Sequence, residues 1–243
     1  MPYRRLPNTD NARVKALQTA YQKGKEIPPF KLAFSQNALQ KVQSFLPGFE
    51  KRILEQKQAY ANQVKRNKEY IAHMKKARLY ISHFIQVLNM AVLRGDIPAA
   101  MRIYFNIDEN DKRVPALTTE QDIIEWGEKI INGEARRTQR GMSPITNPTI
   151  AVVKVRYENF VDAYQNQKTL QKNNTRALNE LAALRPEADE IITQIWDEVE
   201  KSFNDLPEDL KREKATDYGV AYVYRKNEIS RIKFFEPTKL SFG

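Results

Sequence analysis

Residues 49–94 read FEKRILEQKQAYANQVKRNKEYIAHMKKARLYISHFIQVLNMAVLR, and this stretch decides the fold class. No Gly or Pro interrupts it, and two rows of residues at heptad spacing run along it. One row is Ile53, Tyr60, Asn67, Met74, Ile81 and Leu88, and the other is Val64, Ile71, Arg78, Ile85 and Val92. Heptad spacing over about six repeats predicts one long amphipathic helix packed on another helix.

A second stretch with the same character is expected at about 148–206, where Pro148 suits the first turn of a helix. Pro47 and Pro186 are expected to kink or break their helices, because proline lacks the backbone N–H that a helix interior needs. At the C-terminus, residues 218–224 and 229–235 flank a polar turn and predict a small β-hairpin. The predicted fold class is therefore all-α, an elongated antiparallel helical bundle built on two long helices (49–94 and 148–206), closed by that hairpin.

One helical-bundle domain of 243 residues is expected, with helical halves at 1–117 and 118–217 and a β-hairpin tail at 218–243. A short repeat links the two long helices: Ala59-Tyr60-Ala61-Asn62-Gln63 recurs as Ala163-Tyr164-Gln165-Asn166-Gln167. The repeat predicts two related halves about a pseudo-twofold axis.

The residue types argue against the common catalytic and metal sites. The chain has no cysteine, and its two histidines, His73 and His83, point about 80° apart on one helix, so they cannot share a metal within one subunit. No Gly-rich phosphate loop or nucleophile elbow is present. We therefore expect no catalytic residues, cofactor or metal. The absence of an apolar leader or span predicts a cytoplasmic protein without membrane insertion.

The net charge of +10 is unevenly distributed, with a basic stretch at 51–80 and an acidic stretch at 187–209. If the long helices pack antiparallel, these two flanks are expected to lie side by side and to fix the register. The alternative is a nucleic-acid-binding surface. Its contacts would be Lys57, Lys65, Arg66, Lys68, Lys75 and Lys76, together with Arg225, Lys226, Arg231 and Lys233 in the aromatic and basic tail.

Polar residues replace apolar ones in the middle of both long helices: Tyr60, Gln63, Asn67, Tyr164, Gln167, Gln171 and Asn174. These residues, the polar layer, are either solvated, part of a subunit or partner interface, or the lining of a polar cleft. The segment between Gly133 and Gly141, with Glu134 and three arginines, is interpreted as a solvated connection, with an anion site as the alternative.

Three short motifs carry a family resemblance: Pro2-Tyr3-Arg4-Arg5-Leu6-Pro7-Asn8-Thr9-Asp10 at the start, Gly133-Glu134 before the arginine cluster, and Tyr218-Gly219-Val220 near the end. Together they resemble an all-helical family of bacterial proteins to which no activity is attached. The resemblance implies an all-α cytoplasmic bacterial protein and assigns no residue a role.

The sequence thus predicts a non-enzymatic scaffold or protein-interaction module, with self-association or a protein partner through exposed parts of the long helices. A nucleic-acid-binding protein is the first alternative. The second is a ligand-binding or enzymatic bundle with its site in the polar layer.

Overall fold

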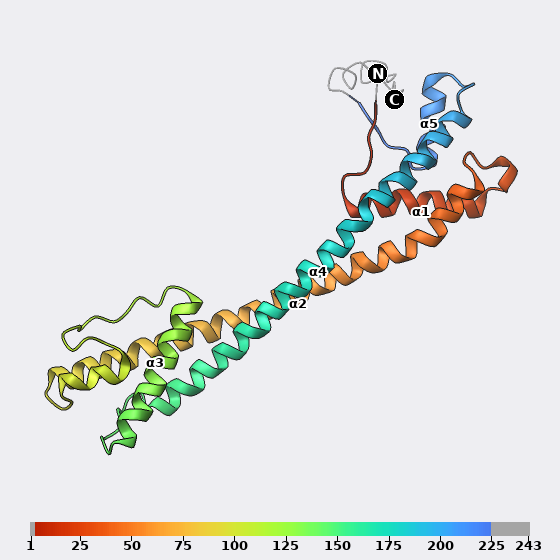
Figure 1. Cartoon of the computed structure of the whole chain (residues 1–243). Coiled ribbons are helices and arrows are strands. Elements are labelled where there is room, and N and C mark those ends of the chain that lie inside the picture. Colours follow the sequence, from red (N-terminus) through yellow and green to blue (C-terminus); the bar gives the residue numbers. More distant parts are fainter. Residues whose placement is uncertain (1–2, 225–243) are drawn as a thin grey trace, which may run out of the picture. The chain divides into compact units, whose positions relative to one another are not determined.

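The computed structural model describes residues 3–224, and most of them are helical (Figure 1). The predicted all-α fold class with two long helices is confirmed. In chain order the elements are β1 (Tyr3–Arg4), α1 (Asp10–Glu26), the 3₁₀ helix η1 (Pro29–Lys31), α2 (Gln36–Leu93), the 3₁₀ helix η2 (Ala99–Phe105), α3 (Glu120–Gln139), α4 (Ile150–Ser202), α5 (Glu208–Asp217) and β2 (Tyr222–Val223). Within the described residues, no helix has the length and apolar character that crossing a membrane requires.

A kink or a break was expected at two prolines, and neither proline breaks its helix. Pro47 lies inside α2 and Pro186 lies inside α4, and both are exposed. A proline in a helix interior costs about 3 kcal/mol. Burial of Phe45 and Phe49 on either side of Pro47 contributes about 1.5–3 kcal/mol per side chain. Tertiary packing therefore offsets the local cost and extends α2 back to Gln36.

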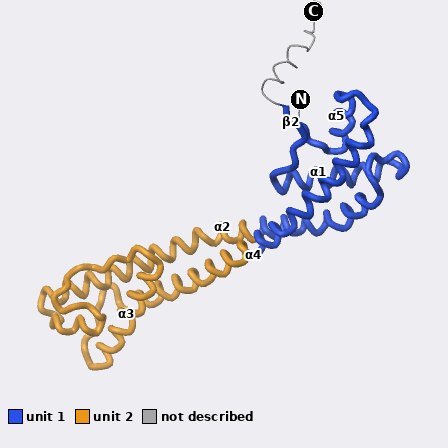
Figure 2. The backbone as a smooth tube through the Cα atoms, turned by 45° about the horizontal axis from the view of Figure 1, so that its top comes forward, with its two compact units in different colours: residues 1–58, 176–243 blue, residues 59–175 orange. Residues whose placement is uncertain are grey.

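The chain divides into two compact units: residues 1–58 with 176–243 form unit 1, and residues 59–175 form unit 2 (Figure 2). The division does not follow the predicted halves, because α2 and α4 each contribute one segment to each unit. The pseudo-twofold relation stays a prediction.

In unit 1, the first part of α2 runs antiparallel to the last part of α4. Contacts at Ser35–Glu198, Lys41–Gln194 and Arg52–Glu180 show the opposite order of residue numbers along the two helices. The core between them, α1 and the segment after α5 includes Leu17, Val42, Phe49, Ile192, Ile195, Trp196, Val199 and Tyr218.

In unit 2, residues 59–93 of α2 and 150–175 of α4 again run antiparallel and pack with α3 and η2. Their shared core includes Ile81, Phe84, Ile85, Leu88, Phe105, Ile123, Ile130, Val153 and Phe160. Helix α3 begins at Glu120 because Thr119 caps it and Asp122 completes a capping box.

A strand forms inside the predicted 218–224 segment, but its partner is at the opposite end of the described chain. β2 pairs antiparallel with β1, in the register Tyr3 with Val223 and Arg4 with Tyr222. The pairing expected with residues 229–235 lies outside the described residues.

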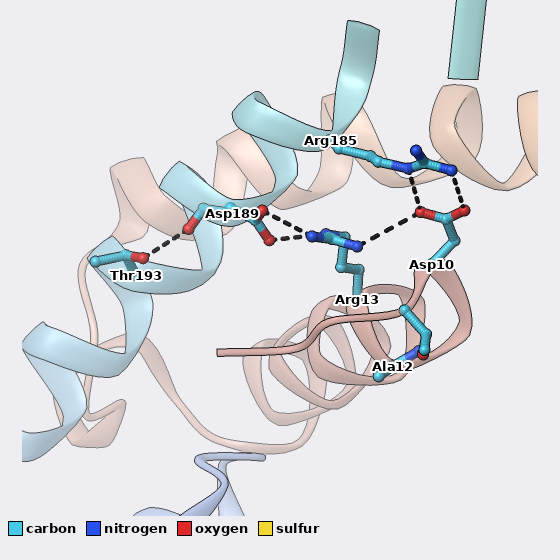
Figure 3. Close-up of polar contacts among 7 residues, drawn as sticks. Asp10, Ala12, Arg13, Arg185, Asp189 and Thr193 are labelled. Carbon is cyan, nitrogen blue, oxygen red and sulfur yellow. Dashed lines mark hydrogen bonds and ion pairs between the residues drawn. The ribbon is translucent and has the colours of Figure 1, made fainter. Parts of the chain in front are cut away.

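The prediction that the basic stretch 51–80 lies against the acidic stretch 187–209 is wrong. The acidic residues pair instead with the N-terminal segment: Arg4 contacts Asp197 at 2.6 Å, and Arg13 donates to Asp189 at 2.8 and 2.9 Å (Figure 3). Because α2 begins at Gln36, the segment of α2 that reaches the acidic half of α4 precedes residue 51.

Candidate functional site

The structure brings together four of the seven residues of the polar layer, in two pairs across α2 and α4 of unit 2. The Asn174 amide donates to Gln63 Oε1 at 2.9 Å. The Gln167 amide donates to Asn67 Oδ1 at 3.3 Å. These cross-helix contacts fix the register at this level of the unit.

The other three residues of the polar layer do not join these pairs. Tyr60 and Gln171 are exposed, whereas Tyr164 is half-buried against Phe160. The hollow beside the layer is accordingly not lined by the two tyrosines.

That hollow is a groove of about 650 Å³ in unit 2, between α2 and α4. Its walls carry amides and charged groups, and its floor contains Gln167 and Tyr70. The lining residues are Asn62, Lys65, Arg66, Glu69, Tyr70, His73, Asn159, Asp162, Ala163, Asn166, Gln167, Thr169 and Leu170. We call it the amide groove.

Sequence reasoning missed most of the amide groove, although one signal for it was present. In the five-residue repeat, Asn62 and Asn166 occupy equivalent positions, and both line this groove. The heptad rows drew attention to Tyr60 and Tyr164 in the same repeat. A residue two positions away on a helix lies about 200° around the axis, so the asparagines point to a different side from the tyrosines.

Gln167 is the most constrained member of the amide groove. Only 4% of the residue is exposed, and its Oε1 receives no hydrogen bond within residues 3–224. An unpaired buried carbonyl costs about 1–3 kcal/mol. Stability alone would therefore not favour a glutamine at position 167.

Tyr70 forms the other part of the floor. Its hydroxyl donates to Glu120 Oε1 at 2.7 Å, and its ring stacks on Phe160 with centroids 6.4 Å apart. Burial, together with this bond to a carboxylate, raises the pKa of the Tyr70 hydroxyl above its ordinary value. The same hydrogen bond lowers the pKa of Glu120. The pair holds the N-terminus of α3 against α2.

The predicted nucleic-acid contacts separate into three groups. Lys57 lies in unit 1, where its ammonium donates to Asn11 at 3.5 Å. Five lie exposed on α2 of unit 2, where Arg66 pairs with Glu69: Lys65, Arg66, Lys68, Lys75 and Lys76. Arg225, Lys226, Arg231 and Lys233 lie outside the described residues.

Two of the exposed lysines belong to a mixed apolar and basic face of α2. Val64, Ile71 and Leu79 are 53%, 36% and 64% exposed. At about 100° per residue, they fall with Lys68 and Lys75 within an arc of about 80°, directed away from the core of unit 2. We call these five residues the outward face. It contains no acidic residue, since Glu69 is the only Asp or Glu between Gln56 and Arg94 and lies outside the arc.

The segment interpreted as a solvated connection is instead part of α3 and includes a buried ion pair, so that interpretation is wrong. Glu134 and Arg137 are 0% and 2% exposed. The guanidinium donates to both Glu134 oxygens at 2.9 Å and to the Ser143 carbonyl at 2.6 Å, and the Ile145 N–H donates to Glu134 at 2.7 Å. These bonds fasten the loop after α3, and the pair is buried rather than open to a solvent anion.

Comparisons of this chain with protein-family models, with curated proteins and with solved structures found no match. The candidate sites therefore rest on the geometry of the chain's own residues, and two stand out in unit 2: the amide groove and the outward face of α2.

Proposed function

We propose that this protein is a non-enzymatic interaction module that binds an acidic helix of a partner protein along the outward face of α2. One observation carries the proposal: three large aliphatic side chains, Val64, Ile71 and Leu79, are exposed at helical spacing and alternate with two lysines. Isolated exposed aliphatic residues are common on protein surfaces, but a row at helical spacing matches the way one amphipathic helix docks on another.

The aliphatic residues and the lysines make different contributions to such a complex. Covering an aliphatic side chain contributes up to about 1.5–3 kcal/mol, whereas an exposed ion pair contributes only about 0–1 kcal/mol. The affinity would thus come from Val64, Ile71 and Leu79, and the lysines would select a negatively charged partner. Pairing of this face with the same face of a second copy would bring lysines against lysines, which favours an acidic partner over symmetric self-association.

The proposal is tested with a fluorescein-labelled helical peptide that has leucines at i, i+4 and i+7 and glutamates beside them. We expect binding that weakens with salt, and that becomes at least about tenfold weaker when Ile71→Ser and Leu79→Ser are combined. Val155→Ser is the matched control, because Val155 is also an exposed aliphatic residue in unit 2 but lies on α4. Equal affinity of the double variant and the control would refute the proposal.

Nucleic-acid binding is the second candidate, because Lys65, Lys68, Lys75 and Lys76 form no ion pair within the described part of the chain. A duplex DNA ligand would lose about 0.9 log units of affinity per phosphate contact for each log unit of salt. Combining Lys68→Glu with Lys75→Glu would weaken the binding of both DNA and the acidic peptide. The two serine substitutions would weaken peptide binding alone, and this difference separates the two candidates.

A further inference from the structure

We infer that the amide groove of unit 2 binds an extended segment of polypeptide through its main chain. The observation behind this inference is the concentration of carboxamides at one hollow: Asn62 from α2, and Asn159, Asn166 and Gln167 from α4. The side-chain amides of Asn62, Asn159 and Asn166 have no hydrogen-bond partner among residues 3–224. Three free amides and one buried carbonyl therefore border the same space.

A carboxamide is the side chain that best matches a peptide unit. It carries an N–H donor and a carbonyl acceptor side by side, so it can bond the C=O and the N–H of a main chain without regard to the side chain between them. Walls with charged groups of one sign and no carboxamides would instead favour ions, and apolar walls would favour aliphatic or aromatic ligands. This groove combines carboxamides with charges of both signs. The lining of this groove thus specifies a ligand with repeated amide groups.

The spacing of the amides fits an extended chain. Asn159 and Asn166 are seven residues apart on α4, which corresponds to about 10.5 Å along the helix axis. A polyproline-II-like segment repeats its orientation every three residues, over about 9.3 Å. The two asparagines can therefore contact peptide units three residues apart on one bound segment.

The charges in the groove add a preference for certain side chains. Lys65 lies on the α2 wall and Asp162 on the α4 wall, and neither forms an ion pair within residues 3–224. A segment with one acidic and one basic side chain would satisfy both.

Gln167 explains why the groove keeps a polar floor. Its Oε1 accepts nothing within the described residues and is closed to solvent. In the bound state, rotation of the Gln167 side chain toward the groove lets a main-chain N–H of the segment supply the missing donor. Gln167→Leu removes this acceptor, and also the amide that donates to Asn67, while keeping a similar volume; Asn67 is exposed, so water replaces the donor that it loses. We expect this variant to be at least as stable as the parent, yet to bind the segment about tenfold more weakly.

The test uses the acetylated and amidated peptide Ala-Lys-Ala-Ala-Asp-Ala, added to the full ¹⁵N-labelled chain. We expect saturable shifts of the side-chain amide resonances of Asn62, Asn159 and Asn166. Asn166→Ala should weaken binding by about tenfold, and Asn173→Ala, an exposed asparagine of α4 outside the groove, should leave it unchanged. The same peptide with an N-methylated backbone should also bind about tenfold more weakly, because it lacks N–H donors.

Three outcomes would overturn the inference: no shifts of the groove amides, equal binding of the N-methylated peptide, or equal affinity for the single blocked amino acid acetyl-alanine-amide. The last would assign the groove to a small amide ligand. Substitution of Ile71 and Leu79 should not affect this peptide, so the result is independent of the function proposed for the outward face.

Discussion

Removal of one partner of the buried ion pair in α3 should destabilise unit 2 more than the loss of any exposed charge. In Glu134→Ala, Arg137 loses both carboxylate contacts at 2.9 Å, and the Ile145 N–H loses its acceptor at 2.7 Å. Since Arg137 is only 2% exposed, its charge cannot recover this loss from water.

The expected cost is about 3–5 kcal/mol, the range found when a buried ion pair is broken by removing one partner. Glu69→Ala is the matched control, since Glu69 pairs with Arg66 at the same spacing of three residues and the same distance of 2.9 Å, but in solvent. The control should leave stability almost unchanged, because water replaces the lost contact.

The assay is urea unfolding followed by tryptophan fluorescence. The chain has two tryptophans, Trp126 on α3 in unit 2 and Trp196 in the core of unit 1. A Trp196→Phe background therefore reports unit 2 alone, and all variants are compared within it. A free energy of unfolding for Glu134→Ala equal to that of the exposed control would refute the reasoning.

A second variant separates charge from packing. Glu134→Leu combined with Arg137→Met removes both charges and keeps apolar volume, so it should recover most of the loss seen with Glu134→Ala. A further loss in the double variant would show that shape, rather than the unpaired charge, determines the cost.

Three further outcomes are expected in unfolding and titration experiments. Gly48→Ala should stabilise unit 1 by about 0.5–1 kcal/mol, because Gly48 lies in a helix interior and an added methyl meets nothing within 4 Å. Gly133→Ala should instead destabilise unit 2 by about 1–3 kcal/mol, because its methyl would lie 2.6 Å from a backbone carbonyl oxygen. Urea unfolding measures both changes. The pKa of Glu120, measured by carboxyl ¹³C shifts, should lie below the ordinary glutamate value and rise in Tyr70→Phe, and an unchanged value would contradict the role of that hydrogen bond. Burial and the nearby Glu128 carboxylate raise the pKa of Tyr157 to about 12. The contribution of this shift to stability is therefore complete below about pH 10 and is lost as the pH rises toward about 12. Tyr157→Phe should lack this component of the alkaline unfolding curve.

The helices were predictable because the information for them is local. Heptad spacing identified α2 and α4. Proline was a misleading signal for the same reason. The local cost at Pro47 was correctly recognised, but the tertiary burial of Phe45 and Phe49 that offsets it is not visible in a window of neighbouring residues.

The candidate sites were predictable only in part. The sequence placed Gln63, Asn67, Gln167 and Asn174 at one level of the two long helices and left open whether they are solvated, form an interface or line a cleft. In the structure they make contacts across α2 and α4. The amide groove beside them was missed, because an isolated asparagine on a helix looks like an ordinary solvated residue. Its significance appears only when asparagines from two helices border one space.

The sequence by itself determined that this chain folds into long amphipathic helices, because the period of apolar residues fixes the secondary structure. Only the tertiary structure decided the register of those helices and therefore which faces are covered. Ile71 and Ile85 belong to the same heptad row, yet Ile71 is 36% exposed and Ile85 is fully buried. Periodicity shows that two residues share a face of a helix. Whether another segment packs against that face depends on contacts between residues far apart in the chain, and these contacts leave the outward face of α2 open and bury Glu134 with Arg137.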